Sequence, residues 1–194
     1  MSNMIHGAYH LSSNSTLYEV QRSNNFEFQV GFDLTKKILK AGVTTTDETD
    51  YLNARDSQEY LRLSVTQSSV PHFTQQPIEI KRGNSTIKAA GVPTFAEGSL
   101  VVNDFIGADA KSILMAWQRL SYDVTTEKVG KMSDYKVNCV LTEYTPNYEQ
   151  VRYWDLIGCW ISGISEPEHN MESGDKRQVT ATIQYDYAIP HLAD

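Results

Sequence analysis

The feature that most constrains the fold of this chain is a period-two alternation of apolar and polar side chains. In residues 25–32, Phe26, Phe28, Val30 and Phe32 alternate with polar or small residues. Successive side chains of a β-strand point to opposite faces, so this pattern is typical of a strand that buries one face. We therefore expect a fold built mainly from half-buried strands.

The same alternation predicts strands elsewhere in the chain. They cover residues 60–66, 77–81, 86–90, 136–142, 151–164 and 178–187. Gly83-Asn84-Ser85 joins the second and third of these segments and predicts a short hairpin. Residues 151–164 are rich in aromatic residues and alternate less strictly, so we expect packing on both faces or a bend at Gly158.

One segment has helical spacing instead. In residues 109–121 the apolar side chains Ala110, Ile113, Leu114 and Trp117 follow the i, i+3, i+4, i+7 pattern of an amphipathic helix. Asp109 precedes this run and suits the N-cap position. The sequence thus predicts a mainly β fold, an antiparallel β-sandwich or a partly closed β-barrel, flanked by one α-helix.

The expected core combines this helix with the strands. Its predicted members are Phe28, Ile113, Leu114, Trp117, Trp154, Trp160 and Ile183. Cys139 and Cys159 lie in apolar strand segments, and two cysteines are too few for a disulfide framework, so we expect buried free thiols. A chain of 194 residues fits one domain over 1–194, since single all-β domains reach about this length.

Two regions show neither period. Residues 1–24 are polar and are expected to form an N-terminal arm, and residues 34–58 are expected to form an extended loop. Long loops inside compact domains are usually functional. The second region still contains apolar residues that a solvated loop would not need, namely Ile38, Leu39, Val43, Tyr51 and Leu52. We expect these five to contact a neighbouring subunit.

Several function classes are disfavoured by composition. The net charge of −7 argues against tight nucleic-acid binding, which requires clustered basic residues. The N-terminus lacks the basic and apolar regions of a signal peptide, and the chain has no long uncharged apolar stretch, so neither export nor a membrane anchor is expected.

The sequence also offers no catalytic, cofactor or metal site. The five histidines are dispersed, and no glycine-rich phosphate loop or His-Glu-x-x-His motif occurs. Asp47, Glu48 and Asp50 lack the glycine and distal glutamate of a calcium loop and are better interpreted as solvated acids. We expect no enzyme activity and no cofactor.

Aromatic residues could form a stacking platform for single-stranded nucleic acid. The residues concerned are Tyr153, Trp154, Trp160, Tyr185 and Tyr187. Such platforms need basic surroundings, and only Arg152 is adjacent, so core packing is the preferred interpretation.

The C-terminal half has a distinctive order of segments. A helix with Ile-Leu-Met-Ala-Trp at 113–117 is followed by an alternating strand, the run Val-Arg-Tyr-Trp-Asp-Leu-Ile-Gly-Cys-Trp at 151–160, and Ile-Gln-Tyr-Asp-Tyr at 183–187. In this order the chain resembles the tail tube proteins of contractile-tailed bacteriophages. The resemblance covers residues 109–187, about two fifths of the chain. These proteins are related to the tubes of contractile injection and type VI secretion systems.

The resemblance implies a structural virion protein rather than an enzyme. Six copies would form a ring, and rings would stack into a hollow tail tube through which DNA passes without specific binding. The implied partners are other copies of the chain, the sheath, baseplate or tail-initiator, tape measure and terminator proteins, with assembly in the host bacterial cytoplasm. The alternatives are a tube protein of an injection or secretion system and a ligand-binding β-barrel module.

Overall fold

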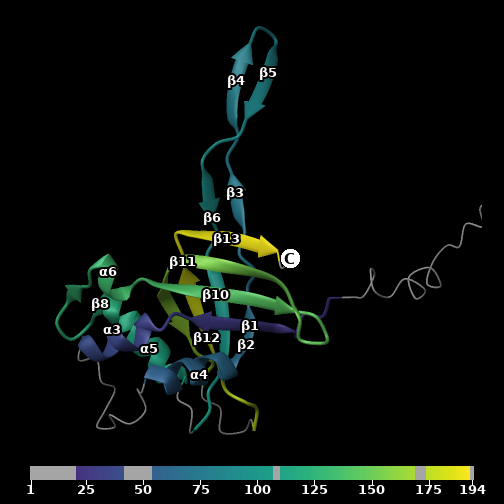
Figure 1. The fold of residues 1–194 in the computed structure, drawn as a ribbon. Helices are drawn as coiled ribbons and strands as arrows, with labels where there is room; N and C mark the ends of the chain where they lie inside the picture. The colour runs from purple at the N-terminus through teal and green to yellow at the C-terminus, as the bar shows by residue number, and fades with distance from the viewer. Residues whose placement is uncertain (1–20, 42–53, 107–109, 169–173, 193–194) are drawn as a thin grey trace, which may run out of the picture.

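The computed structural model describes residues 21–41, 54–106, 110–168 and 174–192, with the backbone alone for 54–57 (Figure 1). Its main element is a seven-stranded antiparallel sheet with the order β1-β10-β11-β12-β7-β2, in which β13 also pairs with β11. The strands are β1 (Phe26–Val30), β2 (Val65–Ser68), β7 (Gly98–Asn103), β10 (Val137–Tyr144), β11 (Gln150–Ser165), β12 (Gln178–Gln184) and β13 (Tyr187–Leu192).

The long strand β11 joins two parts of the sheet. Its first part pairs with β10 on one edge and β13 on the other, and its last residues pair with β12. Between these parts Gly158 has a φ of +72°, in the left-handed region, and the β10 register shifts next to it. The predicted irregularity at Gly158 is confirmed.

The two ends of the sheet, β1 and β2, come close to each other without a hydrogen-bonded ladder between them. The sheet is therefore strongly curved but is not a closed barrel. This arrangement confirms the predicted mainly antiparallel β fold with helix packing.

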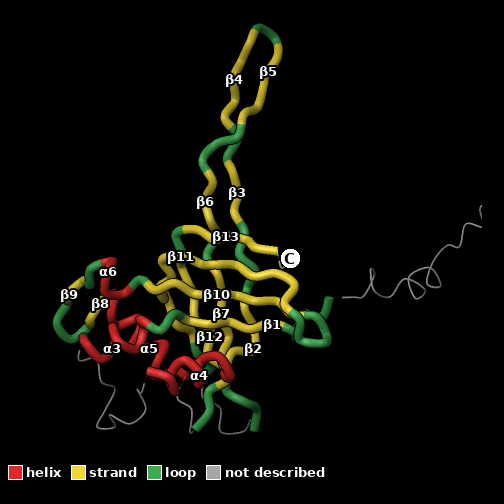
Figure 2. The backbone as a smooth tube through the Cα atoms, viewed as in Figure 1, coloured by secondary structure: helices red, strands yellow, loops and turns green. Residues whose placement is uncertain are grey.

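A layer of short helices covers one side of the sheet (Figure 2). The helices are α3 (Asp33–Lys40), α4 (Ala54–Ser64), α5 (Ala110–Ser121) and α6 (Met132–Tyr135). Helix α5 confirms the predicted amphipathic helix and packs on β11. Its Trp117 is fully buried, and the indole Nε1 donates a hydrogen bond to the Tyr135 carbonyl oxygen at 2.9 Å. Asp109, the predicted N-cap, lies outside the described residues.

The extended loop expected at 34–58 is wrong for both of its ends, which are helical, while residues 42–53 lie outside the described residues. Helix α3 occupies the start of this region, and helix α4 begins within it. In α3 the side chains of Leu34, Thr35 and Ile38 are buried. Their i, i+1, i+4 spacing is a helical stripe only about two turns long, too short to stand out in the sequence.

The strand expected at 60–66 is also wrong for most of its length, because α4 continues to Ser64 before β2 begins at Val65. Leu61 and Ser64 are buried, whereas Leu63 is 65% exposed. Leu61 and Ser64 are three positions apart, and burial at this spacing is typical of a helix, although the apolar residues of the segment alternate as in a strand.

The core lies between the helix layer and the sheet. Phe28, Ile113, Leu114, Trp117 and Ile183 are buried in it. Trp154 is partly buried against the core, and Trp160 is partly buried with its ring edge against Tyr135 at a centroid distance of 5.7 Å. Phe32, expected on the buried face of its strand, is exposed because β1 ends at Val30.

Both cysteines are buried free thiols, as predicted. Burial raises the pKa of the Cys139 thiol well above its usual value, with the nearby Cys159 adding to the effect. Among the described helices, none combines the length and apolar character needed to span a bilayer.

Candidate assembly surface

A two-stranded hairpin arm projects from the body of the molecule (Figure 1). The hairpin arm, residues 73–95, consists of β3 (Phe73–Gln75), β4 (Ile78–Arg82), β5 (Ser85–Ala89) and β6 (Pro93–Phe95). Strand β3 pairs with β6 near the body, and β4 pairs with β5 at the outer end. The arm confirms the predicted hairpin, but it lies outside the main sheet.

The base of the arm is anchored to the body. The backbone of Ser69 donates to the Ser99 carbonyl oxygen at 3.0 Å, and the Ser69 hydroxyl accepts from the Ser99 amide at 2.9 Å. Phe95 contacts Phe73 and Tyr185 at centroid distances of 5.5 and 6.0 Å. Burial raises the pKa of the Tyr185 hydroxyl, as expected for a side chain enclosed at this joint.

Glycines shape the arm at two points. Gly83 has a φ of +57° at the tip, where it and Asn84 form the two-residue turn between β4 and β5. At the waist, a Cβ atom on Gly91 would lie 2.0 Å from the Gln76 carbonyl oxygen, so only glycine allows the two backbones to approach this closely.

The outer hairpin has one apolar and one charged face. Direct cross-strand partners share a face, and the register pairs Ile78 with Ala89 and Ile80 with Ile87. The other face carries Glu79, Lys81, Thr86 and Lys88, with Glu79 and Lys88 in an exposed ion pair at 3.9 Å.

No residue of β4 or β5 is buried, and the isoleucines remain about half exposed. A lone two-stranded hairpin is at best marginally stable in water. An apolar face on such a hairpin, with no core beneath it, is typical of a binding surface. The arm is thus the candidate assembly surface of the described chain.

Of the five residues expected to contact a neighbour, two lie in the described part of the chain. Ile38 is fully buried in the core, so its prediction as an assembly contact is wrong for this arrangement. Leu39, the next residue of α3, is 46% exposed. Val43, Tyr51 and Leu52 lie outside the described residues.

Sequence reasoning recognised the hairpin but not its exposure. Alternating isoleucines are the same signal in a buried strand and in an exposed one. The available signal was the pair of flanking prolines, Pro77 and Pro93, because proline lacks the amide donor that a central strand needs.

A groove of about 650 Å³ lies between the start of β1 and strand β2, and its lining mixes the polar residues of 21–25 and 66–68 with Phe26, Val65, Val70 and Leu141. Among the described residues, no group of three histidine, cysteine or acidic side chains is placed to hold a metal ion.

Comparison with known proteins identifies the fold. No protein-family model and no curated protein sequence matches the chain. A chain of the sheath–tube complex of an extracellular contractile injection system, PVC, matches with a TM-score of 0.63 and 14% identity, over 94% of this chain and 98% of that one. A chain from the tube-terminating cap of the anti-feeding prophage matches with a TM-score of 0.59 and 14% identity, over the whole of both chains.

A third match is a chain of the PVC sheath/tube terminator, with a TM-score of 0.60 and 15% identity over 89% of this chain and 97% of that one. All three matches span nearly the full length of both chains, so the similarity concerns the complete fold. The chain has the fold found in the tube assemblies of contractile injection systems.

Proposed function

We propose that this chain is the tube-forming subunit of a contractile, phage-like tail, in which six copies form a ring and rings stack into a hollow tube. The observation that carries the proposal is the hairpin arm, whose isoleucine face has no partner in the described subunit. In a monomeric protein this apolar surface would stay in contact with water, whereas in a self-assembling protein a neighbouring copy would bury it. The full-length fold similarity to injection-system chains supports the same role.

The acidic composition suits a conduit. A net charge of −7 gives a weakly repulsive wall along which a polyanion slides without being held. In a phage tail the polyanion would be DNA, and the particle would be assembled in the host bacterial cytoplasm. Sheath, baseplate and terminator proteins are the proposed partners, supported by the sheath–tube, terminator and baseplate assemblies that contain the similar chains. A tape measure protein would set the tube length.

A second candidate is the tube of a contractile injection system that delivers proteins instead of DNA. The matched structures favour it, because they belong to an extracellular contractile injection system and to an anti-feeding prophage. Both candidates require the same ring and the same stacking, and both are structural roles without catalysis.

Electron microscopy of the purified chain tests the role. Rings or tubes are expected for the parent protein, and the Ile80→Asp variant should lose them because a charge then occupies the centre of the apolar face. Thr86→Asp places the same charge on the opposite face of the same hairpin and should assemble normally. A parent protein that stays monomeric at all concentrations would refute the proposed function and favour the ligand-binding alternative.

A further inference from the structure

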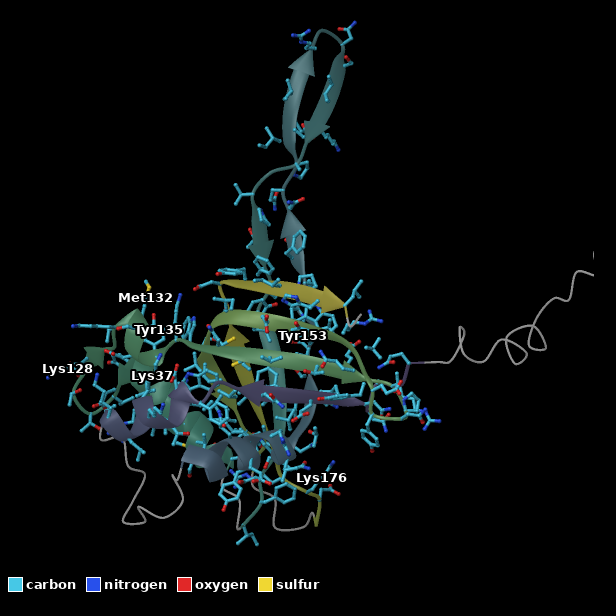
Figure 3. All side chains as sticks on the ribbon, viewed as in Figure 1. Lys37, Lys128, Met132, Tyr135, Tyr153 and Lys176 are labelled. Atoms are coloured by element: carbon cyan, nitrogen blue, oxygen red, sulfur yellow. The ribbon has the colours of Figure 1, made fainter. Side chains whose placement is uncertain are left out.

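A groove of about 460 Å³ lies at the end of the helix layer. It is bounded by the ends of α3 and α5, by α6, and by the turn from β8 (Tyr122–Asp123) to β9 (Lys128–Val129). Its charged lining residues are the bases Lys37, Lys40, Arg119 and Lys128 and the acids Asp123 and Asp134. Figure 3 shows Lys37 and Lys128 at one end of the body, away from the hairpin arm. This basic groove is therefore a surface separate from the candidate assembly surface.

Contacts within the subunit hold the walls of the basic groove in place. The Gly130 amide donates a hydrogen bond to the Ser121 carbonyl oxygen at 2.9 Å and so joins the end of β9 to the end of α5. On the other side, the Lys37 ammonium donates to the Lys136 carbonyl oxygen and joins α3 to the residue after α6. The groove is thus formed completely within one copy of the chain.

The segments that build the groove differ in charge from the rest of the chain. Residues 33–41 and 119–136 contain seven of the 17 lysines and arginines but only four of the 24 acidic residues. The chain as a whole has a net charge of −7. A local excess of positive charge in an acidic protein attracts anionic groups to this place in particular.

One of the two acids in the groove is compensated internally. Arg119 pairs with Asp123 at 3.2 Å, and the same carboxylate accepts hydrogen bonds from the Thr125 amide at 3.0 Å and the Thr126 hydroxyl at 2.9 Å. The hydrogen bond from Thr125, with those from Thr126 and Arg119, holds the pKa of Asp123 below its usual value. Both oxygens of this carboxylate are therefore already in use.

Three lysines remain available for a ligand, against the single acid Asp134. Lys40 and Lys128 are exposed, and Lys37 is half-buried with its charge unaltered by the hydrogen bond to a carbonyl. Within the described ranges, none of the three forms an ion pair. Ammonium groups form their strongest hydrogen bonds with anionic oxygens, so a carboxylate is a suitable ligand for them.

The border of the groove is apolar as well as basic. Val129 lines the groove and is 77% exposed, and Met132, next to the lining residue Ser133, is 66% exposed. Methionine is common on surfaces that bind polypeptides, because its flexible side chain adapts to different partners. A polypeptide can supply carboxylates and apolar side chains together, whereas a nucleic acid would be repelled by the acidic remainder of the chain.

We propose that the basic groove binds an acidic peptide segment of a partner protein. Aspartate or glutamate carboxylates of this segment accept hydrogen bonds from Lys37, Lys40 and Lys128, and one of its apolar side chains contacts Val129 and Met132. The inference goes beyond the proposed function, because the groove needs neither the hairpin arm nor a second copy of the chain.

Fluorescence anisotropy with a synthetic peptide tests the site. The probe is a short fluorescent peptide with glutamates around a single leucine. Replacing its glutamates by glutamine should weaken binding by more than about tenfold, because the charged contacts are lost. Replacing its leucine by serine should weaken binding by about two- to fivefold, because the apolar contact is lost.

Charge reversals locate the binding on the protein. Lys40→Glu and Lys128→Glu should each weaken binding by about three- to tenfold, because a carboxylate then faces the carboxylates of the peptide. Lys176→Glu is the matched control, since this exposed lysine lies elsewhere on the body (Figure 3) and its reversal changes the net charge equally. It should bind like the parent, as should Lys128→Arg, and circular dichroism checks that every variant is folded.

The Ile80→Asp variant separates this inference from the tube role. It should bind the peptide like the parent although it does not assemble, so a protein that never forms tubes leaves the peptide site standing.

Four results would overturn the proposal. If the parent does not bind the glutamate peptide, the groove is not such a site. If Lys176→Glu weakens binding as much as Lys128→Glu, net charge rather than the groove attracts the peptide. If the peptide without leucine binds equally well, or a single-stranded DNA oligonucleotide binds more tightly, the partner is not an acidic polypeptide segment with an apolar contact.

Discussion

The strand β12 and the hairpin arm have the same kind of sequence and opposite environments. In β12 every second residue, Val179, Ala181 and Ile183, is buried beneath the helix layer and the neighbouring strands. In the hairpin, Ile78 and Ile80 alternate with Glu79 and Lys81 in the same way, yet all of β4 is exposed. Alternation therefore determines that a strand has an apolar face, but not which molecule covers that face.

This contrast gives the two regions different energetics. Apolar burial within the subunit stabilises the body, so substitutions there should change the free energy of unfolding. Apolar residues of the arm gain burial only on association, so substitutions there should change assembly instead.

The largest expected effect is in the body, at Trp117. Trp117→Ala removes a fully buried ring and the hydrogen bond to the Tyr135 carbonyl oxygen, so we expect a loss of about 3–5 kcal/mol in the free energy of unfolding. Denaturant titration measures it. Met115→Ala is the matched control, because Met115 lies on the same helix and is 46% exposed, and equal losses from the two variants would contradict the core assignment.

Substitutions of two glycines, one in the body and one in the arm, compare the contributions of these regions to the unfolding free energy. Gly158→Ala places a Cβ atom 2.3 Å from the Asp186 carboxylate on a backbone with φ of +72°, so we expect a loss of about 2–3 kcal/mol in unfolding free energy. Gly91→Ala disturbs only the waist of the arm, so the unfolding free energy should change by less than about 0.5 kcal/mol while assembly weakens. Thermal unfolding and sedimentation distinguish them, and a reversed ranking would show that the arm is part of the folding unit.

A smaller effect is expected from the ion pair between Lys111 and Glu166. Hydrogen bonding from Lys111 lowers the pKa of Glu166 below its ordinary value of 4.5, so the pair stabilises the folded state above pH 4.5 and this stability is lost as the pH falls through the lowered pKa. Glu166→Gln should cost at most about 1 kcal/mol at neutral pH because the group is near the surface.

The difference in melting temperature between parent and Glu166→Gln should shrink as the pH falls below 4.5. Melting curves of both proteins over this range check the sign. A difference that grows on acidification would mean that Glu166 does not act through its ionised form.

The smallest effect on stability is expected in the arm. Ile80→Thr combined with Ile87→Thr removes apolar surface that the subunit does not bury, so the unfolding free energy should change by less than about 0.5 kcal/mol. Val179→Thr makes the same kind of change in the buried face of β12 and should cost about 1–3 kcal/mol, because a hydroxyl is then buried. If the double variant of the arm and Val179→Thr lost comparable amounts of unfolding free energy, the arm would be packed against the body in solution.

Much of the fold could be predicted because its signals are local. The helix around Trp117, the hairpin around Gly83, the bend at Gly158 and the alternation of β12 each follow from spacing or turn residues within a few positions. The buried thiols followed from their place in apolar strands. Strand β7 was missed, because Leu100 is followed by Val101 and Val102 and the alternation is lost.

The sequence by itself determined that β1, β4, β5, β10 and β12 are strands and which face of each is apolar, since backbone geometry converts residue spacing directly into faces. Only the tertiary structure decided that Leu61 and Leu63 belong to a helix, that Ile38 is a core residue, and that Ile80 has no cover. These outcomes depend on which distant segments pack together, and a local pattern carries no information about its partner. The candidate assembly surface is an apolar strand face that packs on no core of its own subunit. Such a face can be recognised only when the tertiary structure shows where the core lies.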